Sequence, residues 1–399
     1  MEFYIQMGHG MQQMILELLQ YWKQGNVILS PINIAADRIE KFAQDIHSYK
    51  GKIIFDPQLY LPREKPDRLS NYNYWPQNNI TLLENGAWDR VLAPLVELNN
   101  KLKTQSVILP AFFDNTINEQ WGEMHDKLIS SAFKYLQPEQ IIHTLALSSN
   151  VLLDVEQVEM IISKAENWNI HGFYLVCQHP NNAYLVDNPL WICNLLTLIT
   201  GLKRINKKIV LGFANHQMLC AGLAKCDAIA AGNFLNTRHF MLNRFEVNDE
   251  ENDISRRSVW YYAPQTLSEY KITFLDLAQQ QGILPLLKPT NAFENPYSSM
   301  LFTANKPSSY SFIESSSNIH YLCALKLQVE NFVQPTFRNT VHNYTIMLQE
   351  SEKLLRKCYA KGIKCAERDF LPILDTLRAA TLIHQENSGF VLEREWNSL

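Results

Sequence analysis

Short apolar segments rich in β-branched residues recur along the first 245 or so residues, each followed by a helical pattern. Uninterrupted apolar segments of this length are typical of strands that are buried on both faces, as in parallel sheets. Amphipathic stretches such as 156–169 and 188–206 lie between them, with apolar residues at helical spacing. The strand-like segments are 26–33, 52–56, 106–114, 141–149, 171–178, 207–215 and 226–232.

Strand–helix alternation over this length is typical of a (β/α)8 barrel or of a doubly wound sheet. We predict the α/β class and a (β/α)8 TIM-like barrel, with an eighth strand supplied by 3–7 or 258–263. The barrel is expected over residues 1–263, with an insertion at about 57–90. Residues 264–399 are expected to form a mostly helical C-terminal extension, packed on the barrel or used for dimerisation.

Charge and cysteine usage exclude several classes of protein. The 399 residues carry 36 Lys and Arg against 40 Asp and Glu, which argues against a protein that grips nucleic acid through phosphates. The seven cysteines form no CxxC pair and the histidines lack metal spacing, so we expect reduced thiols, no metal and no cofactor. No apolar run is long enough to cross a membrane and the N-terminus lacks a basic signal region, so we expect a cytoplasmic protein.

Functional residues of a (β/α)8 barrel lie at the carboxyl ends of its strands. Hydroxyl and amide groups at these positions suit hydrogen bonds to the heteroatoms of a ring-shaped ligand, although polar residues are also common in loops that bind nothing. The strand-end rule selects Asn33, Asp56, Asp114, Ser148, Ser149, Gln178, Asn215, His216 and Asn233.

Asp56 and Asp114 each close an apolar strand-like segment. Two carboxylates at one barrel mouth suit acid–base or glycosyl chemistry, and a carboxylate also matches the N1–H and exocyclic amine of guanine. A structural alternative remains open for each residue. Asp56 precedes Pro57 and would form a turn, whereas Asp114 would cap the following helix.

The segment 207–240 and the segment after it contain further candidates. Arg238 follows the last strand and would clamp an anion or a carboxylate, with an ordinary ion pair as the alternative. The segment 256–278 combines Trp260 with Glu269, and its aromatic residues would stack on a flat ring or pack in a core or an interface.

The order of strand endings resembles that of the tRNA-guanine transglycosylase (queuine tRNA-ribosyltransferase) family, over roughly residues 27–240. Members of that family are (β/α)8 barrels that exchange guanine for a 7-deazaguanine base. IIFDPQLY is similar to the strand that ends in their proton-handling Asp, which implies this role for Asp56. PAFFDN resembles the strand whose Asp recognises the base, which implies Asp114. The segments LALSS and YLVCQ lie where the family has its base-pocket loops. The resemblance therefore matches Ser148, Ser149, Cys177 and Gln178 by position alone, and we expect Ser148, Ser149 and Gln178 to bind the base.

The last part of this resemblance departs from the family pattern. The first residue of the Asp-x-x-Asp pair fits Asp227, but the second, the nucleophile, falls on Ala230. Asp227 or Asn233 is therefore the candidate to replace the nucleophile, and Arg238 matches the family's Thr-Arg. The zinc module is missing, and the charge does not imply a surface that grips tRNA.

The resemblance implies a barrel that recognises guanine or a 7-deazaguanine-type base. Such departures are typical of repurposed relatives, which include the transglycosylase-like proteins of type IV CBASS anti-phage operons. We therefore expect a role in nucleobase modification linked to antiviral defence, with a protein partner and a homodimeric state. Two alternatives stay open: a non-catalytic, protein-binding scaffold, and an unrelated barrel hydrolase that uses the same carboxylates with a metal ion or water.

Overall fold

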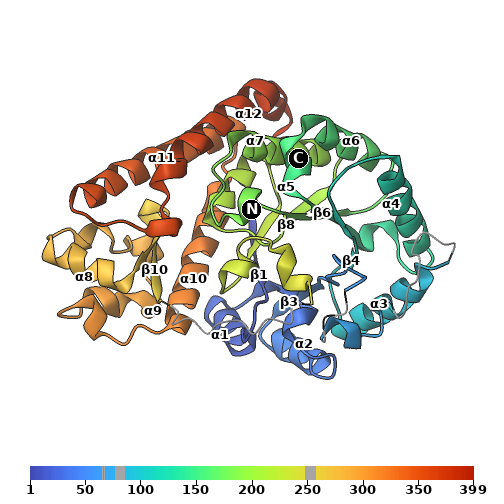
Figure 1. Cartoon of the computed structure of the whole chain (residues 1–399), viewed down its shortest axis with the longest axis horizontal. Coiled ribbons are helices and arrows are strands. Elements are labelled where there is room, and N and C mark those ends of the chain that lie inside the picture. Colours follow the sequence, from blue (N-terminus) through green and yellow to red (C-terminus); the bar gives the residue numbers. More distant parts are fainter. Residues whose placement is uncertain (65, 67, 77–85, 248–257) are drawn as a thin grey trace.

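The computed structural model describes residues 1–64, 66, 68–76, 86–247 and 258–399. Parallel strands form a nearly closed barrel with helices around it (Figure 1), which confirms the predicted α/β TIM-like fold. The strand order is β3-β2-β1-β9-β8-β7-β6-β4, and β5 pairs with β6. The barrel strands are β1 (Glu2–Gln6), β2 (Gly25–Leu29), β3 (Gly51–Phe55), β4 (Val107–Leu109), β5 (Phe113–Asp114), β6 (Ile141–Leu147), β7 (Gly172–Cys177), β8 (Lys208–Leu211) and β9 (Ala228–Ala231).

The two ends of this strand order meet without a regular ladder. Those ends are β3 and β4. In the middle of the order, the first and last barrel strands in sequence, β1 and β9, pair with each other, with Tyr4 opposite Ala230. Between β3 and β4, the amide of Gln105 donates to the carbonyl of Ile53 at 2.9 Å. Strands β4 and β5 share one barrel position and are separated at Pro110, because proline supplies no N–H to a ladder.

The eighth strand is the segment at the N-terminus and not the one near residue 260. Residues 260–263 form β10 (Trp260–Ala263), which pairs antiparallel with β11 (Ser268–Lys271) in a separate hairpin. Tyr261 and Tyr270 of this hairpin belong to a second hydrophobic cluster outside the barrel core. The boundary expected at residue 263 therefore falls inside a hairpin.

Helices cover the outside of the barrel and continue into the C-terminal region (Figure 1). Between β8 and β9 the connection is a 3-10 helix, His216–Ala224, where the sequence indicated a short helix. The α-helices are α1 (Gln12–Trp22), α2 (Ile39–Ser48), α3 (Asp89–Leu102), α4 (Glu119–Ala132), α5 (Ser149–Leu153), α6 (Val155–Ala165), α7 (Pro189–Arg204), α8 (Ile272–Gln280), α9 (Pro296–Ser299), α10 (Glu314–Phe332), α11 (Phe337–Ala360) and α12 (Leu374–Glu395).

Helix α10 takes the place of the eighth barrel helix. It packs against β1, α1 and the 3-10 helix between β8 and β9. Its residues Leu322, Leu325 and Val329 are fully buried in the same hydrophobic cluster as the barrel strands. The chain thus leaves the barrel after β9, builds the hairpin with α8 and α9, and returns to complete the helical ring.

Three further features bear on the expectations from sequence. All seven cysteines are buried and free of disulfides. Within the described residues, no helix combines the length and hydropathy that a membrane span requires. Aromatic residues of the insertion at 57–90, including Tyr60, Tyr74 and Trp88, are buried in the core, whereas residues 65, 67 and 77–85 lie outside the described part.

Candidate functional site

The mouth of the barrel is filled by the protein's own aromatic side chains. Phe240, from the loop after β9, lies with its ring centroid 5.1 Å from Tyr60 and 5.4 Å from Phe213. Phe245 packs on the same tyrosine at 4.9 Å. All four side chains are at most 3% exposed. The place where (β/α)8 barrels usually hold their substrate is therefore closed by a packed aromatic layer.

Asp56 lies at the carboxyl end of β3, against this aromatic layer, and is 1% exposed. The Tyr60 hydroxyl lies 3.0 and 2.9 Å from its two oxygens, and the Tyr174 hydroxyl is 3.4 Å from Oδ2. Tyr174 in turn donates to Gln6, whose amide donates to Ser30. The expected position at a strand end is confirmed, but the carboxylate belongs to an internal polar network.

Burial raises the pKa of Asp56 to about 7, although hydrogen bonds from Tyr60, Gln58 and Tyr174 act in the opposite direction. The Gln58 amide donates to Oδ1 at 3.0 Å, so Asp56 also makes the turn that its position before proline suggested. Arg244 is half-buried nearby, and the Asp56 carboxylate attracts it. A carboxyl with this pKa is suited to proton transfer, but no lining residue of the cavity described below reaches it.

Asp114 lies in β5 and makes different contacts. Its Oδ2 accepts a hydrogen bond from the Trp121 indole at 3.0 Å and lies 3.6 Å from Nε2 of His125. The helix that follows is capped by Asn118, whose side chain accepts from the Trp121 amide, so the capping role expected as the alternative for Asp114 is wrong. Asp114 and Asp56 share the carboxyl end of the barrel, but among the described residues they have no bonding partner in common.

The other polar residues at the strand ends hold local structure. The Ser148 hydroxyl caps α5, and Asn215 caps the 3-10 helix that follows β8. Gln178 accepts from the amide of Ser149 at 3.4 Å and donates to Asn182 at 3.3 Å. These hydrogen bonds stabilise loops at the mouth of the barrel. The cavity described below is lined by none of the residues that form them, which are Ser148, Ser149, Gln178, Asn182 and Asn215.

Asp227 lies at the opposite end of the barrel. It directly precedes β9, its two oxygens each accept from Lys203 at 3.0 Å, and Oδ2 also accepts from the Ile209 amide at 2.7 Å. Asp56 follows β3, whereas Asp227 precedes β9, so parallel strands separate them by the height of the barrel. The two residues expected to act together do not form one site.

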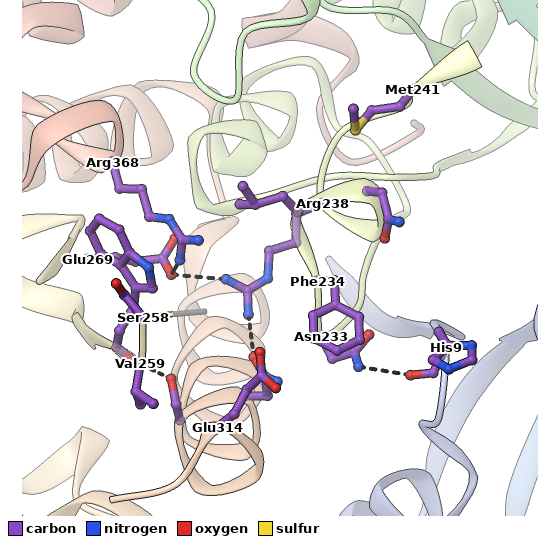
Figure 2. A pocket seen from close by; sticks show the side chains of 15 residues that line it. His9, Asn233, Phe234, Arg238, Met241, Ser258, Val259, Glu269, Glu314 and Arg368 are labelled. Atoms are coloured by element: carbon purple, nitrogen blue, oxygen red, sulfur yellow. Dashed lines mark hydrogen bonds and ion pairs between the residues drawn. The ribbon is translucent and has the colours of Figure 1, made fainter. Parts of the chain in front are cut away.

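A cavity of about 490 Å³ opens beside the carboxyl ends of β9 and β1, and we call it the rim cavity (Figure 2). Asn233 and His9 lie on one side of it, and Glu269 and Arg368 on the other, with Arg238 between them. Its size is ordinary for a small-molecule site. The lining residues are His9, Asn233, Phe234, Leu235, Asn236, Arg238, Met241, Ser258, Val259, Trp260, Glu269, Glu314, Ser317, Asn318 and Arg368.

Glu269 joins two arginines beneath this cavity. Its Oε2 accepts from Nη1 of Arg238 at 3.1 Å and from Nη1 of Arg368 at 2.8 Å, and its Oε1 accepts from the Tyr184 hydroxyl at 2.8 Å. Burial alone would raise the pKa of Glu269, but the two guanidinium groups outweigh it and hold the pKa at about 2. The carboxylate is therefore charged across the physiological range.

The two arginines differ in how completely they are bonded. Arg238 is 2% exposed, stacks 3.5 Å above the Tyr321 ring and also donates to Gly232 and Asn318. Arg368 lies 4.1 Å over the Trp260 ring, and its buried Nε has no hydrogen-bond partner in the described structure. Arg368 lines the cavity with a side chain that is 14% exposed, so it keeps donor capacity there.

Asn233 and Asn236 also keep unused hydrogen-bonding capacity at the rim cavity. Nδ2 of Asn233 donates to the His9 carbonyl at 3.2 Å, which fixes the orientation of the amide group. Its Oδ1 lies against Gly8, and neither this atom nor the buried Oδ1 of Asn236 has a hydrogen-bond partner in the described structure. Buried polar atoms without partners are uncommon, and a bound ligand is one way in which they are satisfied.

The sequence pointed to part of this cavity. Asn233 and Arg238 were predicted from their place after the last strand, and both line it. Trp260 and Glu269 lie in the segment 256–278, which the sequence analysis singled out for its aromatic residues. Arg368 was missed, because it meets Glu269 from 99 positions away and no local pattern marks it.

Comparison with known proteins adds little to this geometry. No protein-family model matches the chain, and no curated protein matches it in sequence. Among solved structures, a thiamine phosphate pyrophosphorylase from Pyrococcus furiosus aligns with 58% of this chain and 85% of its own, at a TM-score of 0.31 and 12% identity. A likeness this distant gives no guide to ligand or activity. The barrel architecture itself is established by the strand pairing.

Proposed function

We propose that this protein is a ligand-binding barrel that recognises guanine or a 7-deazaguanine-type base in the rim cavity. The observation that carries the proposal is the pair of unpartnered acceptors, Oδ1 of Asn233 and Oδ1 of Asn236. The edge of guanine presents N1–H and an exocyclic amine, which are donors that these oxygens and the carboxylate of Glu314 match. Trp260 and Phe234 also line the cavity, and their aromatic side chains suit contact with a flat ring.

From the resemblance to the transglycosylase family, the proposal takes the binding of the base and not the chemical reaction. The position that it assigns to the nucleophile is Ala230, which is fully buried in β9 and has no nucleophilic group. Asp227, at the far end of the barrel, is not placed to replace it. We therefore propose that the chain binds a base without the family's covalent glycosyl step, as a divergent relative that serves nucleobase modification in anti-phage defence.

A panel of bases tests this proposal by thermal unfolding of the full chain. Guanine, 7-cyano-7-deazaguanine and 7-amido-7-deazaguanine are expected to raise the melting temperature, since a ligand at 100 times its Kd adds about 2.7 kcal/mol of stability. Adenine, which lacks the N1–H and the exocyclic N2 amine, is the negative control. Absence of stabilisation by all three guanine-type bases would refute base recognition.

Two variants locate the site. Asn233→Ala removes an acceptor from the cavity and is expected to abolish the shift caused by guanine-type bases. Asp114→Asn alters a residue that does not line the cavity, so the shift is expected to persist. Loss of the shift in Asp114→Asn, with retention in Asn233→Ala, would move the site to the β5 end of the barrel. Melting of each variant without ligand shows whether it is folded.

A second candidate function, a protein-binding scaffold, is favoured by the filled barrel mouth and by α12. On α12, the large apolar side chains of Leu382, Ile383 and Phe390 are 63%, 41% and 75% exposed. On this proposal, α12 pairs two copies of the chain.

Sedimentation equilibrium is expected to give a dimer for the native chain and a monomer for Leu382→Asp combined with Phe390→Asp. A native monomer, or a dimer unaffected by both substitutions, would contradict pairing through α12.

A further inference from the structure

The charges beneath the rim cavity do not balance. Arg238 and Arg368 share the carboxylate of Glu269, at 3.1 and 2.8 Å, and neither makes an ion pair with another carboxylate in the described residues. The side chains of Arg238 and Glu269 are 3% exposed and that of Arg368 is 14% exposed. Two guanidinium groups and one carboxylate leave one positive charge largely shielded from water.

Arg368 carries the part of this charge that a ligand can reach. Arg238 uses each of its nitrogens within the protein, in bonds to Gly232, Glu269 and Asn318. Arg368 lines the cavity with a side chain that is 14% exposed and donates to Glu269, and its Nε has no hydrogen-bond partner among the described residues. The Trp260 ring beneath its guanidinium holds the group in place at the cavity.

The geometry points to a ligand that carries an oxyanion, which we infer to be a phosphate or carboxylate bound by Arg368. A buried cation without a counter-charge is costly, and a guanidinium fork fits the two oxygens of such a group. For the ring of the ligand, the inference rests on the base recognition proposed above. The oxyanion and the base together describe a phosphorylated nucleoside, with its ring near Asn233 and Asn236 and its phosphate at Arg368.

The carboxylate of Glu314 is expected to affect the base and the phosphate of the ligand differently. It lines the same cavity and is partly exposed, in the first turn of α10. Its carboxylate suits the donor edge of a guanine ring but repels a phosphate. Removing its charge should therefore affect the two parts of the ligand in opposite directions.

Calorimetric titration of the full chain with guanosine 5′-monophosphate, guanosine and inorganic phosphate tests the inference. The monophosphate is expected to bind at least about tenfold more tightly than guanosine, and phosphate alone to bind weakly. Arg368→Gln should bring the affinity for the monophosphate down to that for guanosine and leave guanosine unaffected. This variant should fold, because Glu269 keeps Arg238 as a partner of opposite charge.

Two further variants keep the result interpretable. Arg368→Lys retains the charge but loses the fork, so an intermediate affinity for the monophosphate is expected. Glu314→Gln should strengthen phosphate binding and weaken guanosine binding. Equal affinities of the native chain for monophosphate and guanosine, or unchanged monophosphate binding in Arg368→Gln, would overturn the oxyanion inference. Binding of phosphate through Arg368 without any binding of guanosine would support the inference and refute base recognition.

Discussion

Replacing Glu269 by glutamine is expected to lower the free energy of unfolding by about 3–5 kcal/mol, because it leaves two guanidinium groups without a counter-charge. Glu269 is 3% exposed, and its oxygens receive hydrogen bonds from Arg238, Arg368 and Tyr184. Glutamine keeps nearly the same shape and one acceptor, so the loss would report the charge. Thermal or urea unfolding, followed by tryptophan fluorescence, measures the change.

The chain offers a matched control at the surface. Glu352 also lies between two arginines, Arg356 and Arg378, but these side chains are 69% and 32% exposed. Water screens this second cluster, so Glu352→Gln is expected to change stability far less than Glu269→Gln. Equal losses for the two variants would mean that the arginines at Glu269 are hydrated and need no carboxylate.

Acid should act on the native protein through the same group. The pKa of Glu269 is about 2 in the folded chain and has an ordinary value of 4.5. The unfolded chain therefore takes up the proton first as pH falls, and the folded state loses stability between about pH 4.5 and 2. Glu269→Gln should lack this part of the acid dependence. An unchanged acid profile in the variant would assign the dependence to other carboxylates.

The barrel could be predicted because its strands are uninterrupted apolar segments, a pattern that needs no tertiary information. The choice of the eighth strand could not be made in the same way, since 3–7 and 258–263 are both apolar. Pairing decides it: Tyr4 is opposite Ala230 in the barrel, whereas Tyr262 is opposite Glu269 in a hairpin. Pro110 also divides one predicted strand into two.

The candidate site was predictable only in part, for a related reason. The strand-end rule correctly assigned Asp56 to the carboxyl end of the barrel, but it carries no information on loops that return to fill the mouth, as Phe240 does. It likewise found Asn233, which lies just after β9, whereas Arg238 was predicted separately from the loop that follows this strand. Arg368 reaches the cavity from the C-terminal region, and its contact with Glu269 depends on how that region packs.

Replacing Asp56 by asparagine is expected to stabilise the protein at pH 8. The pKa of Asp56 is raised from 3.8 to about 7, so the folded chain holds a proton that the unfolded chain loses above about pH 4. Native stability should therefore fall as pH rises from about 4 to 7 and level off above that range. At about 1.4 kcal/mol for each pH unit, the ionised carboxylate costs on the order of 4 kcal/mol at pH 8.

Asparagine can keep the hydrogen bonds of the protonated carboxyl. Its Oδ1 can accept from Tyr60, and its amide can donate to the Tyr174 hydroxyl, which itself donates to Gln6. Unfolding measured at pH 5 and pH 8 should show a gain for Asp56→Asn mainly at pH 8. The control is Asp375→Asn, at a side chain that is 94% exposed, where little change is expected at either pH.

The opposite result would change the interpretation of the barrel mouth. If Asp56→Asn is less stable than the native chain at pH 8, the carboxylate is charged there and is held by the attraction of Arg244. In that case, the aromatic side chains of Phe240 and Phe245 would shield an ionised pair of Asp56 and Arg244 from water. Ligand binding in the rim cavity should survive the substitution in either case, because Asp56 does not line that cavity. Measuring both properties on one variant therefore separates the internal polar network from the site at the rim.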